Sequence, residues 1–194
     1  MEENKIVIKQ PEQKKQVDKK NKVIKEIISY ALIILVVVVI RIFIFEPVRV
    51  DGPSMDTTLA DGQVLILNKL RYRMTDIRRY DIVVVDVDGT RIIKRVIGLP
   101  NEVIEIKDNK VYADGKELDN SFASTVSADF KMSDIGLVKV PGDSYIVMGD
   151  NRAISLDSRT PKEGDSGIGP VKKDQIIGRV TFRIWPLNKI GVVD

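Results

Sequence analysis

A membrane-length apolar segment near the N-terminus constrains this chain more than any other feature. Residues 27–45 number 19 and include a single charged residue, Arg41. A helix needs about 20 apolar residues to cross the hydrocarbon core of a bilayer. Arg41 lies about one turn from the end of the segment, so its long side chain can reach the interface, and Pro47 then ends the helical pattern. We therefore predict a transmembrane helix over residues 27–45.

Two other interpretations of this segment fit less well. The apolar run exceeds the roughly 7–15 apolar residues of a cleavable signal peptide, and no small-x-small cleavage site follows it. A buried helix of a soluble domain is disfavoured because every face of the segment is apolar. A membrane anchor that remains in the protein is the interpretation we keep.

The anchor is preceded by a lysine-rich stretch, residues 1–26, which holds eight lysines with acidic residues between them. This stretch has too few apolar residues to bury a core, so we predict a flexible tail. The positive-inside rule keeps such a tail in the cytoplasm. The expected division is a cytoplasmic tail at 1–26, a single-pass anchor in the cell membrane at 27–45, and an extracytoplasmic domain at 46–194.

Neither histidine nor cysteine occurs among the 194 residues. Their absence excludes disulfides, thiolate nucleophiles, a Ser-His-Asp triad, thiolate metal sites and the commonest metal ligand. We therefore predict no metal and no cofactor. The net charge of +3 is small and no basic and aromatic stripe is present, so nucleic acid is not an expected partner.

The region after Pro47 shows a β pattern of short apolar runs separated by turns. Asp88-Gly89 and Asp114-Gly115 are typical of hairpin turns that need positive φ. Many short strands without a helical segment of more than two turns predict an all-β barrel or sandwich. The predicted strands are 64–67, 82–85, 91–97, 103–106, 111–112, 136–140, 145–148 and 176–184.

Two further segments of this region have distinctive compositions. Residues 119–135 are polar and rich in small side chains, which predicts a surface loop or insertion. The segment 182–187 contains Trp185 and either packs into the core or lies against lipid headgroups, where tryptophan is favoured. The sequence leaves these two alternatives open.

A serine follows the anchor closely, in the run Asp-Gly-Pro-Ser-Met at 51–55. Val48 and Val50 alternate with a polar residue, so a strand leads into a Gly-Pro turn that presents Ser54. Such a serine is usually no more than a turn residue, and its position alone does not make it a nucleophile.

Lys94 stands inside an apolar strand pattern at 92–97. On a strand its side chain shares a face with Ile92 and Val96. Burial there disfavours the charged ammonium and lowers its pKa, and a neutral amine can take the proton of a serine hydroxyl. A lysine at a barrel rim, with its amine in water, fits the same strand pattern.

A dense polar loop at 149–159 follows the predicted strand at 145–148. Asp and Asn side chains in such a loop commonly close a network of turns. A calcium loop fits poorly, because its ligand spacing and terminal Glu are missing.

Four segments together resemble type I signal peptidases, in the short single-anchor form of Gram-positive bacteria. Their order, their spacing and the preceding anchor also agree, so the resemblance covers about residues 27–186. The segments are Gly-Pro-Ser-Met at 52–55 with Thr-Leu at 58–59, Tyr-Asp-Ile-Val-Val-Val at 80–85, Ile-Lys-Arg-Val-Ile-Gly-Leu-Pro at 93–100, and Gly-Asp-Asn-Arg-x-x-Ser-x-Asp-Ser-Arg at 149–159.

The resemblance implies a mostly β catalytic domain at the bilayer and an endopeptidase that removes signal peptides from secretory preproteins at Ala-x-Ala-like sites. Ser54 would attack the scissile carbonyl, and its N–H would be one oxyanion donor. Lys94 would be the base, and the hydroxyl of Ser155 would hydrogen-bond the Lys94 amine and orient it.

The resemblance also implies supporting residues. Asp157 and Arg159 would form an ion pair that braces the loop, and Asp150 and Asn151 would shape it. Shallow apolar pockets would take small substrate residues. The candidates for these pockets are Val48, Val50, Met55, Leu59 and Ile93.

The chain departs from the family pattern at three places. Thr57 replaces a usual proline, and Asn-Glu at 101–102 replaces a usual Gly-Asp. Some relatives have a serine two residues before the nucleophile as a second oxyanion donor, and this position is Gly52. The first two changes are compatible with the fold, whereas the third leaves the second donor unassigned.

Two functions from other classes predict features that this chain lacks. An inactive anchored binding or scaffold protein predicts loss of Ser54, Lys94 or Ser155, and all three are present. A soluble self-cleaving regulator with the same serine–lysine pair predicts a DNA-binding helical domain in place of the anchor at 27–45.

Overall fold

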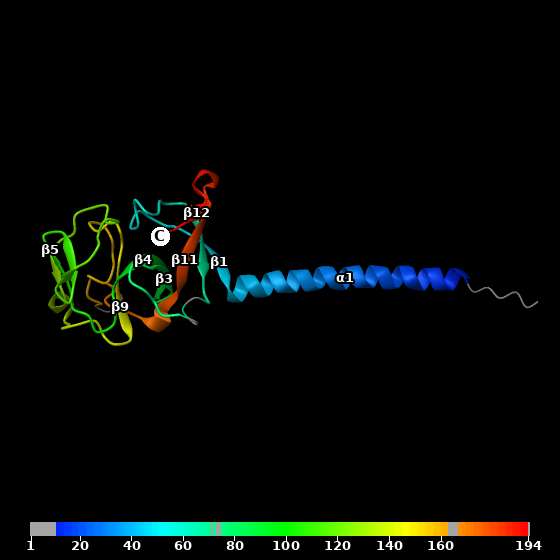
Figure 1. Cartoon of the computed structure of the whole chain (residues 1–194), viewed down its shortest axis with the longest axis horizontal. Coiled ribbons are helices and arrows are strands. Elements are labelled where there is room, and N and C mark those ends of the chain that lie inside the picture. Colours follow the sequence, from blue (N-terminus) through cyan, green and yellow to red (C-terminus); the bar gives the residue numbers. More distant parts are fainter. Residues whose placement is uncertain (1–10, 71, 73–74, 163–166, 194) are drawn as a thin grey trace, which may run out of the picture. The chain divides into compact units, whose positions relative to one another are not determined.

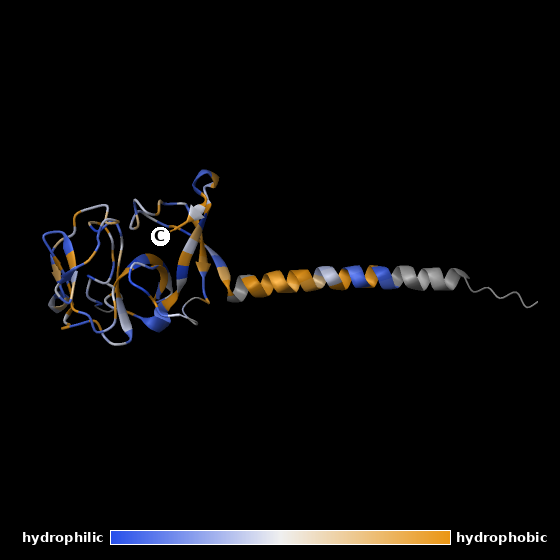
Figure 2. Ribbon diagram, in the orientation of Figure 1, coloured by the Kyte–Doolittle hydropathy of each residue, from blue (hydrophilic) through white to orange (hydrophobic). Residues whose placement is uncertain are grey.

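The computed structural model describes residues 11–70, 72, 75–162 and 167–193, in two compact units that meet between Ile42 and Phe43 (Figure 1). Helix α1, Pro11–Phe43, belongs to the first unit except for its last residue. Within it, Asn21–Ile40 has a mean hydropathy of 2.7 and is long and apolar enough to cross a membrane. Figure 2 shows the change from polar to apolar residues along this helix.

The predicted flexible tail is wrong for residues 11–26, which are helical. Lysine, glutamate and glutamine are good helix formers, so a polar stretch that buries no core still continues a helix into solvent. Residues 1–10 of the predicted tail lie outside the described residues. The helix ends at Phe43 rather than at 45, because strand β1 begins at Phe45 and includes Pro47.

The second unit is mainly β, as predicted, and consists of two antiparallel sheets. The larger has eight strands in the order β1-β2-β11-β3-β4-β9-β10, with β12 also paired to β11, and the smaller has the order β7-β6-β5-β8. Figure 1 shows β5 at the end of this unit opposite to β1. The strands of the larger sheet are β1 Phe45–Arg49, β2 Val64–Asn68, β3 Ile82–Val87, β4 Thr90–Gly98, β9 Ser144–Met148, β10 Val171–Lys172, β11 Ile176–Trp185 and β12 Gly191–Val192. The strands of the smaller sheet are β5 Ile104–Lys107, β6 Lys110–Ala113, β7 Lys116–Glu117 and β8 Phe130–Lys131.

Most predicted strands are confirmed, but the strand predicted at 136–140 is wrong. The 3-10 helix η1, Met132–Ile135, ends at Gly136, whose φ of 72° turns the chain away. The Val140 backbone bonds to residues 101 and 102 at 3.0 and 2.8 Å without extending into a strand. A short apolar run predicted a strand here, but the left-handed Gly136 ends η1 and redirects the chain, and no regular ladder forms.

The predicted surface loop at 119–135 is also only partly correct. It contains β8 and η1, and the ring of Phe122 packs against Tyr80 and under the guanidinium of Arg95. In contrast, Trp185 and Leu187 of the segment 182–187 are exposed, by 52% and 69%. Their exposure removes the alternative in which these two side chains pack into the core.

Strand β4 positions the candidate site because its alternate residues face different clusters. Ile93 packs with Val50 and Met55, whereas Ile92 and Val96 pack in a separate buried cluster. Residues 90–95 of β4 pair with β3, and β9 joins the other side of β4 only from Arg95 onward. Among the described residues, the first half of β4 therefore has one open edge.

Candidate active site

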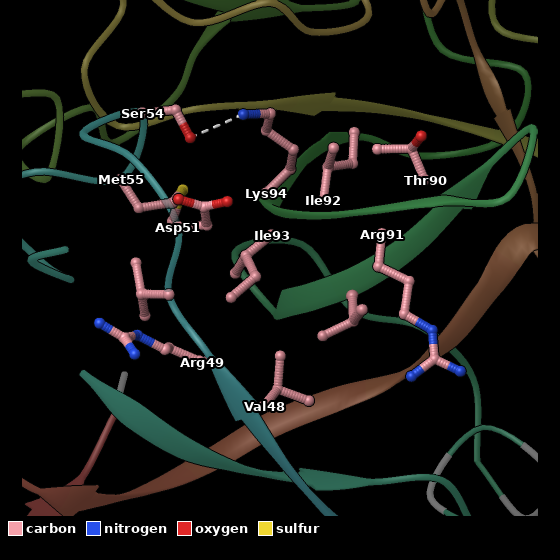
Figure 3. A pocket seen from close by; sticks show the side chains of 12 residues that line it. Val48, Arg49, Asp51, Ser54, Met55, Thr90, Arg91, Ile92, Ile93 and Lys94 are labelled. Carbon is pink, nitrogen blue, oxygen red and sulfur yellow. Dashed lines mark hydrogen bonds between the residues drawn. The ribbon is translucent and has the colours of Figure 1, made fainter. Parts of the chain in front are cut away.

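Ser54 and Lys94 meet although 40 residues separate them in the sequence. Ser54 lies in the turn that follows β1, and Lys94 comes from the middle of β4. The Lys94 Nζ donates a hydrogen bond of 2.8 Å to the Ser54 Oγ, and Figure 3 shows the two groups pointing toward each other. Lys94 is 4% exposed, so the lysine is not at a solvent-exposed barrel rim.

Burial lowers the pKa of the Lys94 amine to about 8. The carboxylates of Asp157 and Asp150 oppose this shift, and the Arg159 guanidinium adds to it. Loss of hydration disfavours the ammonium, and the two carboxylates only partly compensate. A substantial fraction of the amine is therefore neutral in mildly alkaline solution, which is the state that can accept a proton from a hydroxyl.

A cavity of about 260 Å³ adjoins the Ser54–Lys94 pair. Residues 48–51 of the β1 segment and 90–94 of β4 line its two sides, and Ser54, Met55 and Val84 complete it. Four of the five predicted pocket residues line this cavity: Val48, Val50, Met55 and Ile93.

The prediction that Leu59 lines a pocket is not supported. Leu59 is fully buried in the cluster that includes Met55 and Leu65. Its N–H bonds to Met55 O at 2.8 Å, which forms a tight turn and directs the leucine side chain into the core. Leu59 therefore packs in the core next to the turn and does not line the cavity.

The polar loop at 149–159 contains the expected ion pair. Arg159 Nε and Asp157 Oδ1 are 2.8 Å apart, and the fully buried Asp157 also accepts a hydrogen bond of 3.0 Å from the Gly149 N–H. A Cβ on Gly149 would overlap both Ser155 Oγ and Ser54 O, so only glycine fits where the loop passes the serine turn.

A second buried ion pair, which the sequence analysis missed, joins this loop to β4. Arg95 Nη2 lies 2.8 Å from Asp150 Oδ2, with side chains 4% and 0% exposed. The Thr58 hydroxyl donates to the same Asp150 oxygen at 2.6 Å. The position of Arg95 beside Lys94 in a mostly apolar strand could have indicated a buried charge, but nothing local identifies Asp150 as its partner.

A family model described as "Signal peptidase, peptidase S26" matches residues 22–185. The chain belongs to this family. A signal peptidase I of Bacillus licheniformis is 35% identical over 190 residues, which cover 94% of this chain and 99% of that protein. The signal peptidase I S of Bacillus subtilis (strain 168) is 37% identical over 177 residues, 86% of this chain and 93% of that protein.

A solved signal peptidase I from Enterococcus faecalis V583 aligns with a TM-score of 0.49 and 30% identity, over 55% of this chain and 98% of that one. The resemblance that the four sequence segments indicated is confirmed by the family model and by the two Bacillus relatives.

One feature of the signal peptidase pattern differs here from the sequence-based expectation, and the second oxyanion donor remains unassigned. The Ser155 Oγ is buried, but among the described residues it has no hydrogen-bond partner, so its predicted bond to Lys94 is not formed. Gly52, at the position of the second oxyanion donor, has a φ of 80°, and its N–H donates to Asp61 Oδ1 at 3.0 Å. The Gly52 N–H is therefore already bonded within its own turn.

Proposed function

We propose that this protein is a membrane-anchored serine endopeptidase that cleaves signal peptides from exported preproteins. The observation that carries the proposal is the 2.8 Å contact between the Ser54 hydroxyl and the buried Lys94 amine. A weak nucleophile becomes reactive when a general base lies within hydrogen-bond distance. Membership of the signal peptidase family supports the same activity.

In the proposed mechanism, neutral Lys94 accepts the proton of Ser54 as the Oγ attacks the scissile carbonyl carbon. When Lys94 is neutral, the Ser54 hydroxyl donates the hydrogen bond and the Lys94 Nζ accepts it. The resulting ammonium gives its proton to the leaving amine, and an acyl-enzyme remains. Lys94 next takes a proton from water, whose oxygen attacks the ester carbon. As the ester bond breaks, Lys94 gives that proton to the Ser54 Oγ, and the acid product leaves.

The N–H of Ser54 is the proposed oxyanion donor. No described residue accepts a hydrogen bond from this N–H, which leaves it available to the substrate. An oriented donor stabilises the negative charge that develops on the carbonyl oxygen without reorganising in the reaction.

We propose that the preprotein binds as an extended strand between β1 and the open edge of β4. An added strand satisfies the unpaired backbone groups of a sheet edge, while alternate side chains enter pockets. Val48, Val50, Met55 and Ile93 line a cavity of about 260 Å³ beside the serine. These four apolar side chains suit small apolar substrate residues, as in Ala-x-Ala sites.

The polar loop is proposed to support the pair rather than to react. Asp157 with Arg159 braces the loop, and Asp150 with Asn151 shapes it around the serine turn. Ser155 remains a proposed orienting residue for Lys94, because a buried hydroxyl without a partner is costly and is available to the amine during proton transfer.

The decisive experiment is cleavage by the purified full-length chain in detergent. We expect it to cut a preprotein that carries an Ala-x-Ala site and to leave intact the same preprotein with large residues at both alanine positions. Ser54→Ala should abolish cleavage while the circular dichroism spectrum stays unchanged. If the wild-type chain binds the preprotein without cutting it, the protein is instead an inactive scaffold on the same fold.

We further propose that residues 1–26 are cytoplasmic, 27–45 span the membrane and 46–194 lie outside. The eight lysines of the first segment favour this orientation. Protease added to intact protoplasts should digest the domain after residue 46 and spare an epitope tag at the N-terminus. The control is lysed protoplasts, in which both parts are digested. Protection of the C-terminal domain in intact protoplasts would contradict both the topology and the proposed function.

A further inference from the structure

We propose that Asn151 and Thr125 form a polar clamp that orients the peptide unit carrying the Ser54 N–H. The inference rests on the proposed function, in which that N–H stabilises the oxyanion. It deepens the general expectation that Asn151 shapes the loop, and it assigns a positioning role to a segment whose composition indicated only a surface loop.

Asn151 holds the backbone on both sides of Ser54. Its N–H donates to Ser54 O at 3.0 Å, and its Nδ2 donates to Pro53 O at 3.3 Å. Pro53 O and the Ser54 N–H belong to one planar trans peptide unit and therefore point in opposite directions. Pro53 O also accepts a hydrogen bond of 3.1 Å from the Asp56 N–H of the same turn. The Asn151 amide adds a second donor from the polar loop, and the two donors together hold the direction in which the Ser54 N–H points.

Thr125 sets the orientation of the Asn151 side-chain amide. The Thr125 Oγ1 accepts a hydrogen bond of 3.0 Å from the Ala153 N–H, and it donates one of 3.0 Å to Asn151 Oδ1. The amide oxygen is thereby directed to Thr125 and the amide nitrogen to Pro53 O. With the amide reversed, Oδ1 would face Pro53 O, and two acceptors would oppose each other.

Ser124, next to Thr125, is hydrogen-bonded both to the polar loop and to the turn that contains Ser54. The Ser124 N–H donates to Asp150 O at 2.9 Å, and the Ser124 hydroxyl donates to the backbone oxygen of Asp56. Residues 124–125 therefore connect the polar loop to the turn that presents Ser54. The connection joins three segments that are distant in sequence, around the one peptide unit whose direction matters for the oxyanion.

The clamp should act on the transition state and not on substrate binding. A donor that is held in place is worth more in the transition state than in the ground state, because negative charge develops only there. Loss of one hydrogen bond that orients the donor should lower kcat about fivefold to tenfold. KM, the melting temperature and the apparent pKa of the rate profile should remain close to those of the wild type.

The test compares three variants of the full-length chain in detergent. Thr125→Val keeps the side-chain shape and removes both hydrogen bonds, whereas Thr125→Ser keeps the hydroxyl. Asn151→Asp keeps the acceptor for Thr125 but replaces the donor to Pro53 O by a second acceptor. We expect Thr125→Val to lose kcat about fivefold to tenfold, Asn151→Asp to lose more, and Thr125→Ser to retain most of the activity.

A peptide aldehyde provides a second readout, because its adduct with Ser54 carries an oxygen at the oxyanion position. Affinity for the aldehyde should fall by the same factor as kcat in Thr125→Val, while affinity for an uncleaved peptide stays unchanged. The clamp is refuted if Thr125→Val keeps full activity, if Thr125→Ser is as slow as Thr125→Val, or if KM and the melting temperature change together with kcat. A wild-type chain that does not cleave preproteins would contradict the proposed function instead.

Discussion

Replacing Lys94 by methionine is expected to abolish cleavage and leave the fold intact. Methionine matches the length of the buried side chain but cannot accept the Ser54 proton. A general base contributes about 10²–10⁴-fold to a rate, so kcat/KM should fall by at least about a hundredfold. Lys94→Arg should be as inactive, because a guanidinium stays protonated at any working pH. Initial rates and circular dichroism on the same preparations check both expectations.

The matched control for this prediction is Lys107→Met, which removes an exposed lysine of β5. It should cleave at the wild-type rate. Substantial activity in Lys94→Arg would show that another group is the base and would remove the serine–lysine pair from the mechanism.

The pH dependence of the wild-type rate follows from the same lysine. Its pKa of about 8 lies below the ordinary lysine value because burial disfavours the charge. Below about pH 8 the amine is protonated and inactive as a base, so kcat/KM should rise with pH and level off above about pH 8. A rate that is already constant at about pH 6 would instead indicate a carboxylate base.

Breaking the buried ion pair between Arg95 and Asp150 is expected to cause the largest loss of stability. Asp150→Ala leaves the buried guanidinium of Arg95 without its carboxylate. Removing one partner of a buried pair costs about 3–5 kcal/mol of unfolding free energy. Urea denaturation of the full chain in detergent, followed by circular dichroism, measures this change.

Two variants separate the ion pair from other causes of instability. Glu117→Ala removes the partner of Lys110 in a pair whose side chains are about half exposed, and it should leave the unfolding free energy nearly unchanged. The double variant Arg95→Met with Asp150→Leu should be more stable than Asp150→Ala, because the charge at position 95 is removed together with its carboxylate. A double variant as unstable as the single one would exclude the unpaired charge as the cause.

The sequence alone determined the features that depend on local patterns. A segment of 19 residues with a single charge predicts an anchor-length helix, and short apolar runs between turns identified most strands of both sheets. The four family segments identified Ser54 and Lys94, because residue type and order are directly visible in a sequence. Local patterns failed where a neighbouring conformation intervened, as at 136–140, where the left-handed Gly136 prevents a strand.

Only the tertiary structure decided which residues touch. The Lys94–Ser54 contact spans 40 residues, the Arg95–Asp150 pair spans 55, and the Thr125–Asn151 bond spans 26. Each depends on how strands, turns and loops that are distant in sequence come together, and periodicity carries no information about that arrangement. For the same reason the sequence placed Leu59 in a pocket, whereas the turn that presents Ser54 directs this leucine into the core.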